Sequence, residues 1–144
     1  MTHSFRILDD IALADIAFEA EGDSPEELFR AATQALLETL ADPATVGNEW
    51  EQQITQADDD LDTLLFDWLS EIVYWKDAAG VVFREAKPTL SCEQGIWTLQ
   101  ARLVGSPVDR LKQELRSDVK GVTKHLYGIK RIGSVWKATV VLDV

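Results

Sequence analysis

Apolar and polar residues along this chain follow two periods. Between residues 14 and 21 apolar and polar side chains alternate, which is the pattern of a strand that buries one face. Residues 24–41 and 61–75 instead repeat apolar positions every three or four residues, as an amphipathic helix does. A Ser-Pro-Glu-Glu sequence starting at Ser24 supplies a capping box and a preorganised first turn. The pattern therefore predicts two helices inserted among strands.

Strand signals dominate the second half of the chain. They cover residues 81–86, 89–92, 96–104, 119–126 and 135–142, and shorter extended segments lie at 4–8 and 48–56. We therefore predict an α+β fold, mainly an antiparallel sheet of seven to eight strands with two helices. Residues 105–117 contain only a candidate helical turn. No repeat or linker divides the 144 residues, which predicts one domain, 1–144.

Composition limits the kinds of site that this chain can build. One cysteine excludes an internal disulfide, and two histidines do not supply a zinc site with soft ligands. Any metal would have to be held by oxygen atoms. The apolar runs are far shorter than the ~20 residues of a membrane span, and no signal-peptide pattern opens the chain. We expect a cytoplasmic protein that does not contact membranes.

Charge is distributed unevenly along the chain. The net charge is −11, yet residues 110–137 carry eight basic and two acidic residues, whereas residues 1–109 carry six basic and 22 acidic ones. The acidic total argues against binding of nucleic acid over the whole surface. The asymmetry suits docking on a basic partner while a cationic edge meets a phosphate. A merely solvated surface explains it equally well.

Two aspartates interrupt apolar strand segments at opposite ends of the chain. Asp15 lies in a stretch of small apolar residues, and Asp143 lies near the end of the Val-rich last strand. A carboxylate that enters an apolar layer needs a counter-charge, hydrogen-bond donors or a metal. If the two strands are neighbours, Asp15, Asp143 and the Val144 main chain, with its terminal carboxylate, could converge on a divalent cation. Alternatively, each acid caps a strand end in solvent.

Several segments resemble the archease family in order and spacing. They are Ala14-Asp15-Ile16, Gly22 to Phe29 at a helix start, Leu61 to Leu69 followed by Gly80 to Phe83, and Asp118 to His125 followed by Trp136-Lys137-Ala138 and Val140 to Val144. The ending is the most specific of these matches. Each motif alone would be weak, but their common order over nearly the whole chain makes coincidence improbable.

The resemblance implies an accessory protein and not an enzyme. Archeases assist the GTP-dependent RNA ligase of the RtcB type in tRNA splicing and RNA repair, by promoting guanylylation of the ligase and repeated turnover. The resemblance implies that RNA is contacted only indirectly, through the ligase. The resemblance also implies a metal-binding acidic site, with Asp15 and Asp143 on the family's acidic positions and calcium or magnesium as the metal. Lys120 falls on the lysine of a Val-Lys-Ala-like motif, and Asp118 and His125 are further functional candidates.

The chain also departs from the family pattern. Archeases commonly have a histidine shortly before the Ala-Asp pair, whereas this chain has none there, which leaves Asp9 or Asp10 as substitutes. Gly121 stands where alanine is usual, and Lys124 where tyrosine is frequent. A strand histidine satisfied by a nearby carboxylate is a structural alternative for His125.

Two other functions remain open at this point. Asp15, Asp118 and Asp143 could form the site of a stand-alone metal-dependent phosphoesterase, although the chain has no nucleophile motif and no Gly-rich phosphate loop. The chain could instead be a structural interaction module whose acids only solubilise it. Such a module would have no affinity for cations.

Overall fold

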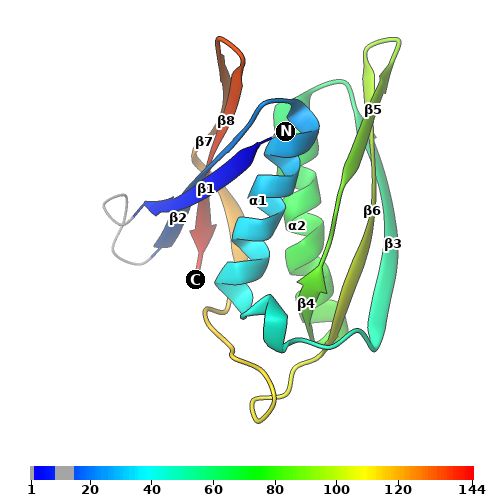
Figure 1. The fold of residues 1–144 in the computed structure, drawn as a ribbon, viewed down its shortest axis with the longest axis vertical. Coiled ribbons are helices and arrows are strands. Elements are labelled where there is room, and N and C mark those ends of the chain that lie inside the picture. Colours follow the sequence, from blue (N-terminus) through cyan, green and yellow to red (C-terminus); the bar gives the residue numbers. More distant parts are fainter. Residues whose placement is uncertain (1, 9–14) are drawn as a thin grey trace.

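Two helices lie between two antiparallel sheets in the computed structural model, which describes residues 2–8 and 15–144 (Figure 1). The elements are β1 (His3–Leu8), β2 (Asp15–Gly22), α1 (Pro25–Leu40), the short 3-10 helix η1 (Pro43–Thr45), β3 (Trp50–Asp58), α2 (Leu61–Ala79), β4 (Val81–Glu85), β5 (Thr89–Glu93), β6 (Ile96–Pro107), β7 (Gly121–Ile132) and β8 (Val135–Asp143).

The first sheet has the strand order β1-β2-β8-β7, so strands from the two ends of the chain lie side by side. The second sheet has the order β3-β6-β4, and β5 also pairs with β6. All of these strand pairs are antiparallel. The order of the first sheet places β2 next to β8, which is the neighbourhood that a shared site for Asp15 and Asp143 requires.

The helices begin and end where local chemistry favours it. The Ser24 hydroxyl accepts a hydrogen bond from the Glu27 backbone N–H at 3.1 Å, which caps α1. The Asp60 carboxylate caps α2 by accepting from the Thr63 N–H at 3.3 Å. Gly80 ends α2 in the left-handed region with φ 65°, which glycine adopts without steric cost.

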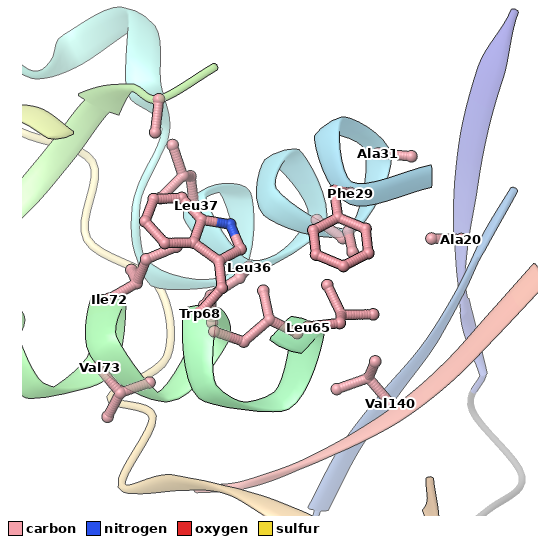
Figure 2. Packing of buried hydrophobic residues seen from close by; sticks show 14 of the residues in the cluster. Ala20, Phe29, Ala31, Leu36, Leu37, Leu65, Trp68, Ile72, Val73 and Val140 are labelled. Atoms are coloured by element: carbon pink, nitrogen blue, oxygen red, sulfur yellow. The ribbon is translucent and has the colours of Figure 1, made fainter. Parts of the chain in front are cut away.

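The core fills the space between the helices and both sheets. Figure 2 shows Trp68 of α2 packed beside Leu36 and Leu37 of α1, and Val140 of β8 approaches the same layer. The Trp68 indole N–H, fully buried, donates to the Thr33 hydroxyl at 2.8 Å. A buried polar group with such a partner avoids a large desolvation cost. The packed helices therefore give the first sheet a rigid inner support.

The structure confirms the predicted α+β fold, with two helices and eight strands in antiparallel pairs within the described residues. Their division into two sheets was not predicted, because periodicity shows which side chains are buried and not which strands pair. β7 is longer than the predicted strand 119–126, because an irregularity between Thr123 and Gly128 lets pairing with β8 resume beyond it. The loop 108–117 contains a turn and no helix. No helix in the described ranges is long and apolar enough to cross a membrane.

Candidate functional site

Asp15 and Asp143 lie directly opposite each other in the pairing of β2 with β8. Residues opposite each other in an antiparallel pair present their side chains on the same face, with Cβ atoms about 4.5–5.5 Å apart. Asp143 is exposed and Asp15 is half-buried. The two strands therefore bring together two carboxylates that are separated by almost the full length of the chain. Val144 follows directly, with its side chain against the core.

The charges of this acid pair are not neutralised by an ion pair within the described residues. Farther along the same two strands, Glu21 and Lys137 are also opposite each other and form an ion pair of 3.3 Å. No ion pair among the described residues includes Asp15 or Asp143. Like charges opposite each other destabilise a sheet. A bound cation would turn this repulsion into attraction.

The neighbouring strand leaves open space beside Asp143. Gly121 of β7 is paired with Asp143, and a side-chain carbon placed on Gly121 would meet no atom within 4 Å. The Lys120 backbone N–H donates to the Asp143 carbonyl oxygen at 2.7 Å. The exposed Lys120 side chain therefore starts at the rim of the acid pair.

Asp118 is engaged by a buried lysine. Lys76 of α2 is 7% exposed, and its ammonium contacts the carboxylate of Asp118 at 2.5 Å, that of Asp77 at 2.9 Å and the carbonyl oxygen of Val119 at 2.6 Å. These three acceptors match the three protons of the ammonium group. Lys76 thus ties the end of α2 to the segment that leads into β7 and to Lys120.

The ion pair changes the ionisation of both partners. Burial opposes the charge on Lys76, but the hydrogen bonds with Asp118 and Asp77 outweigh it and raise the lysine pKa. The hydrogen bond from Lys76 lowers the pKa of Asp118. Both groups are therefore charged at neutral pH. The Asp118 carboxylate thus fixes the segment before β7 to Lys76 and is not a member of the acid pair.

The importance of Lys76 was missed from the sequence, although a signal for it was present. Leu69, Ile72 and Val73 mark the buried stripe of α2, and Lys76 continues that stripe at helical spacing. A lysine on a buried stripe requires acceptors nearby. The stripe could therefore have pointed to a buried ion pair, though not to Asp118 as the partner.

His125 lies on the irregular part of β7, away from the acid pair. It is exposed, and its backbone N–H donates to the Thr123 hydroxyl at 3.3 Å. Gly121 of β7 pairs with Asp143, and Thr123 pairs with Val141. The bulge that carries His125 begins after Thr123, so it lies beyond the part of β7 that is paired with Asp143. The structure does not bring His125 together with the two acids. The proposed substitutes Asp9 and Asp10 lie outside the described residues.

The donors present fit a hard cation by type. Carboxylate and carbonyl oxygens are the ligands that calcium and magnesium take, and the acid pair offers two side-chain carboxylates. Within residues 2–8 and 15–144, no three or more His, Cys, Asp or Glu side chains gather into one metal-binding group. A cation here would complete its shell with main-chain oxygen or water.

The fold and this site define a small α+β protein that presents a carboxylate pair at the end of a sheet. The family model described as the Archease protein family (MTH1598/TM1083) matches residues 5–144. This chain belongs to the archease family, which confirms the resemblance seen in the sequence motifs.

Individual relatives agree over similar lengths. Protein archease from Methanosarcina barkeri is 32% identical over 91% of this chain and 90% of the relative, and that from Methanopyrus kandleri is 33% identical over 91% and 94%. The solution structure of Methanobacterium thermoautotrophicum protein 1598 has a TM-score of 0.78 and 28% identity, covering 97% of this chain and 98% of that one.

A second solved structure has been described with a possible function. The crystal structure from Thermotoga maritima, described as an archease and possible chaperone, has a TM-score of 0.63 and 25% identity. It covers 92% of this chain and 93% of that one. A role that acts on another protein is consistent with this description.

Proposed function

We propose that this protein is a non-catalytic activator of a GTP-dependent RNA ligase of the RtcB type, active in tRNA splicing or RNA repair. It promotes guanylylation of the ligase and repeated turnover through a divalent cation, calcium or magnesium, held by Asp15 and Asp143. The protein partner is the ligase, and RNA is met only through it. Membership of the archease family supports this class of function.

The observation that carries the proposal is the direct opposition of Asp15 and Asp143 across β2 and β8. An opposed acid pair costs stability in the free protein, so its presence is easiest to understand if it binds a positive ion. The site is at the surface, where a second protein can reach it, because Asp143 is exposed.

The chemistry follows from the needs of guanylyl transfer. A bound divalent cation would offset negative charge on the triphosphate and help to align the reacting groups. Asp15 and Asp143 would hold the ion, and the Val144 main chain could add an oxygen. Lys120, fixed to Asp143 through its backbone N–H, offers an exposed ammonium to a phosphate.

The geometry favours this role over a stand-alone phosphoesterase. That enzyme was expected to use Asp15, Asp118 and Asp143 together, but the Asp118 carboxylate is hydrogen-bonded to Lys76. A carboxylate paired with a buried ammonium is a poor third ligand for a metal. A structural interaction module without affinity for cations would not explain why two acids that repel each other lie opposite each other.

The test is a guanylylation assay of the RtcB-type ligase from the same organism. Asp143→Asn and Asp15→Asn each remove one negative charge while keeping the side-chain size, so both should abolish stimulation above the rate of ligase alone. Asp59→Asn is the matched control, because Asp59 is an exposed acid on the turn before α2; it should stimulate like the unmodified protein. Full stimulation by a folded Asp143→Asn protein contradicts the proposal. Metal-dependent phosphate release by the protein alone favours the phosphoesterase.

A further inference from the structure

The loop between β6 and β7 exposes a leucine almost completely. This loop hangs at the lower end of the molecule in Figure 1, drawn in yellow. Leu111 at its turn is 96% exposed, more than any other large apolar side chain that the structure describes. Its neighbours Arg110 and Lys112 are also exposed. We name residues 110–112 the basic apolar tip.

The buried side chain of Gln113 holds the tip in one conformation. Gln113 is 8% exposed, and its amide donates to the Ser106 hydroxyl at 2.9 Å and to the Pro107 carbonyl at 3.0 Å. Its amide oxygen accepts from the Asp109 backbone N–H at 2.9 Å. The Asp109 carboxylate in turn accepts from the Leu111 N–H at 3.0 Å. A buried amide that is fully engaged fixes the turn beneath an exposed side chain.

The far side of the loop is attached to the end of α1. The Arg116 N–H donates to the Leu40 carbonyl and the Ser117 N–H to the Thr39 carbonyl, each at 3.0 Å. The Asp42 N–H donates to the Glu114 carbonyl at 2.9 Å. The tip is therefore preorganised on both sides, although the Leu111 side chain contributes almost nothing to the core. Preorganisation of this kind lowers the entropy cost of binding a partner.

We propose that the basic apolar tip is a docking element, which inserts Leu111 into an apolar pocket bordered by carboxylates on a protein partner. None of the ion pairs that the described residues form includes Arg110 or Lys112. Their charges are available to carboxylates beside the pocket. Residues 1–109, with 22 acidic and six basic residues, would repel such carboxylates, so the charge pattern favours contact through the basic segment 110–137, to which the tip belongs.

A protein surface suits this tip better than a lipid surface. One leucine buries too little apolar area to hold a protein on a membrane, and residues 1–109 carry 22 acidic against six basic residues, which an anionic bilayer repels. A pocket in a protein can enclose one side chain completely and still place acids beside it.

The segment from Arg110 to Lys120 connects the tip with the acid pair. Asp118 and Arg110 line one hollow of about 440 Å³, and Lys120, two positions beyond Asp118, donates to the Asp143 carbonyl. The segment 110–120 thus runs from the docking element to the backbone of Asp143 in the candidate cation site. This inference rests on the proposed function, in which the partner is the ligase.

The test measures binding of the full chain to the RtcB-type ligase by biolayer interferometry. Leu111→Asp should weaken binding by at least about tenfold, since it puts a carboxylate into an apolar, acid-bordered pocket. Leu111→Met should keep most of the affinity. Ile132→Asp is the matched control, because Ile132 is 59% exposed on the hairpin of β7 and β8 at the opposite end (Figure 1); it should bind normally.

The outcomes separate this inference from the proposed function. Unchanged binding by Leu111→Asp, or an equal loss in Ile132→Asp, overturns the docking element while the activator function stands. If the unmodified protein does not bind the ligase, both fall. Cosedimentation with phosphatidylglycerol vesicles that Leu111→Asp abolishes would assign the tip to membranes and overturn a protein partner. Because Leu111 supports no core contact, loss of folding does not confuse the comparison.

Discussion

Lys76 shows how one side chain controls the segment next to the candidate site. Its ammonium spans Asp118, Asp77 and the Val119 carbonyl, so it joins α2 to the chain that enters β7. The methylene stem is buried while all three protons are used, which satisfies both the apolar and the charged part of the residue.

This ion pair predicts a particular pH dependence of stability. Because the pKa of Asp118 is lower in the folded protein than its unfolded value of about 3.9, the pair stabilises the fold above about pH 5. That contribution is lost as the pH falls through the lowered pKa of the folded protein. The urea midpoint of Asp118→Asn should therefore lie below that of the unmodified protein at pH 7, and the difference should shrink as the pH is lowered below about 4. A difference that is independent of pH would show that another contact is responsible.

Neighbouring strands approach each other closely at some glycines and not at others. Gly105 on β6 is paired with Phe83 on β4, and a side-chain carbon on Gly105 would fall far inside contact distance of the Val82 carbonyl oxygen. Backbone atoms cannot move aside as a flexible side chain can. Gly121 on β7, by contrast, has open space around it.

The two glycines therefore predict opposite responses to alanine. Gly105→Ala should lower the free energy of unfolding by about 3 kcal/mol or more, because the β4–β6 pairing must separate. Gly121→Ala should leave it unchanged or raise it by about 0.4–1 kcal/mol, because alanine restricts the unfolded chain and meets no obstacle. Urea unfolding of both variants measures this contrast. Equal destabilisation of the two would mean that the space at Gly121 is filled in solution.

At the level of elements, periodicity predicted both helices and most strands. It did not predict that β7 continues to Ile132, because the bulge after Thr123 interrupts the alternation. Periodicity also does not predict which strands pair, so it could not predict the division into two sheets. The neighbourhood of β2 and β8 was an assumption from sequence, and the register that opposes Asp15 to Asp143 comes only from the structure. A slip of one residue would send one of the two side chains to the other face.

At the scale of the whole molecule, the acid pair and the basic apolar tip lie at separate positions on the surface of one core. The helices and sheets form a rigid core, and β2 and β8 carry the opposed acids. The sequence indicated Asp15, Asp143 and Lys120 through apolar context and motif order. It did not indicate that residues 108–117 form a fixed loop, because the hydrogen bonds of the Gln113 amide with Ser106 and Pro107 leave no mark on the pattern of apolar and polar positions.

The proposed function requires that Asp15 and Asp143 together hold a divalent cation. The most direct measurement is isothermal titration calorimetry with calcium and with magnesium on the metal-free protein, Asp15→Asn, Asp143→Asn and the control Asp59→Asn. We expect one ion per chain for the unmodified protein and the control, and an affinity lowered by at least about tenfold in each of the other two. No binding to the unmodified protein, or equal affinity in Asp143→Asn, would contradict it.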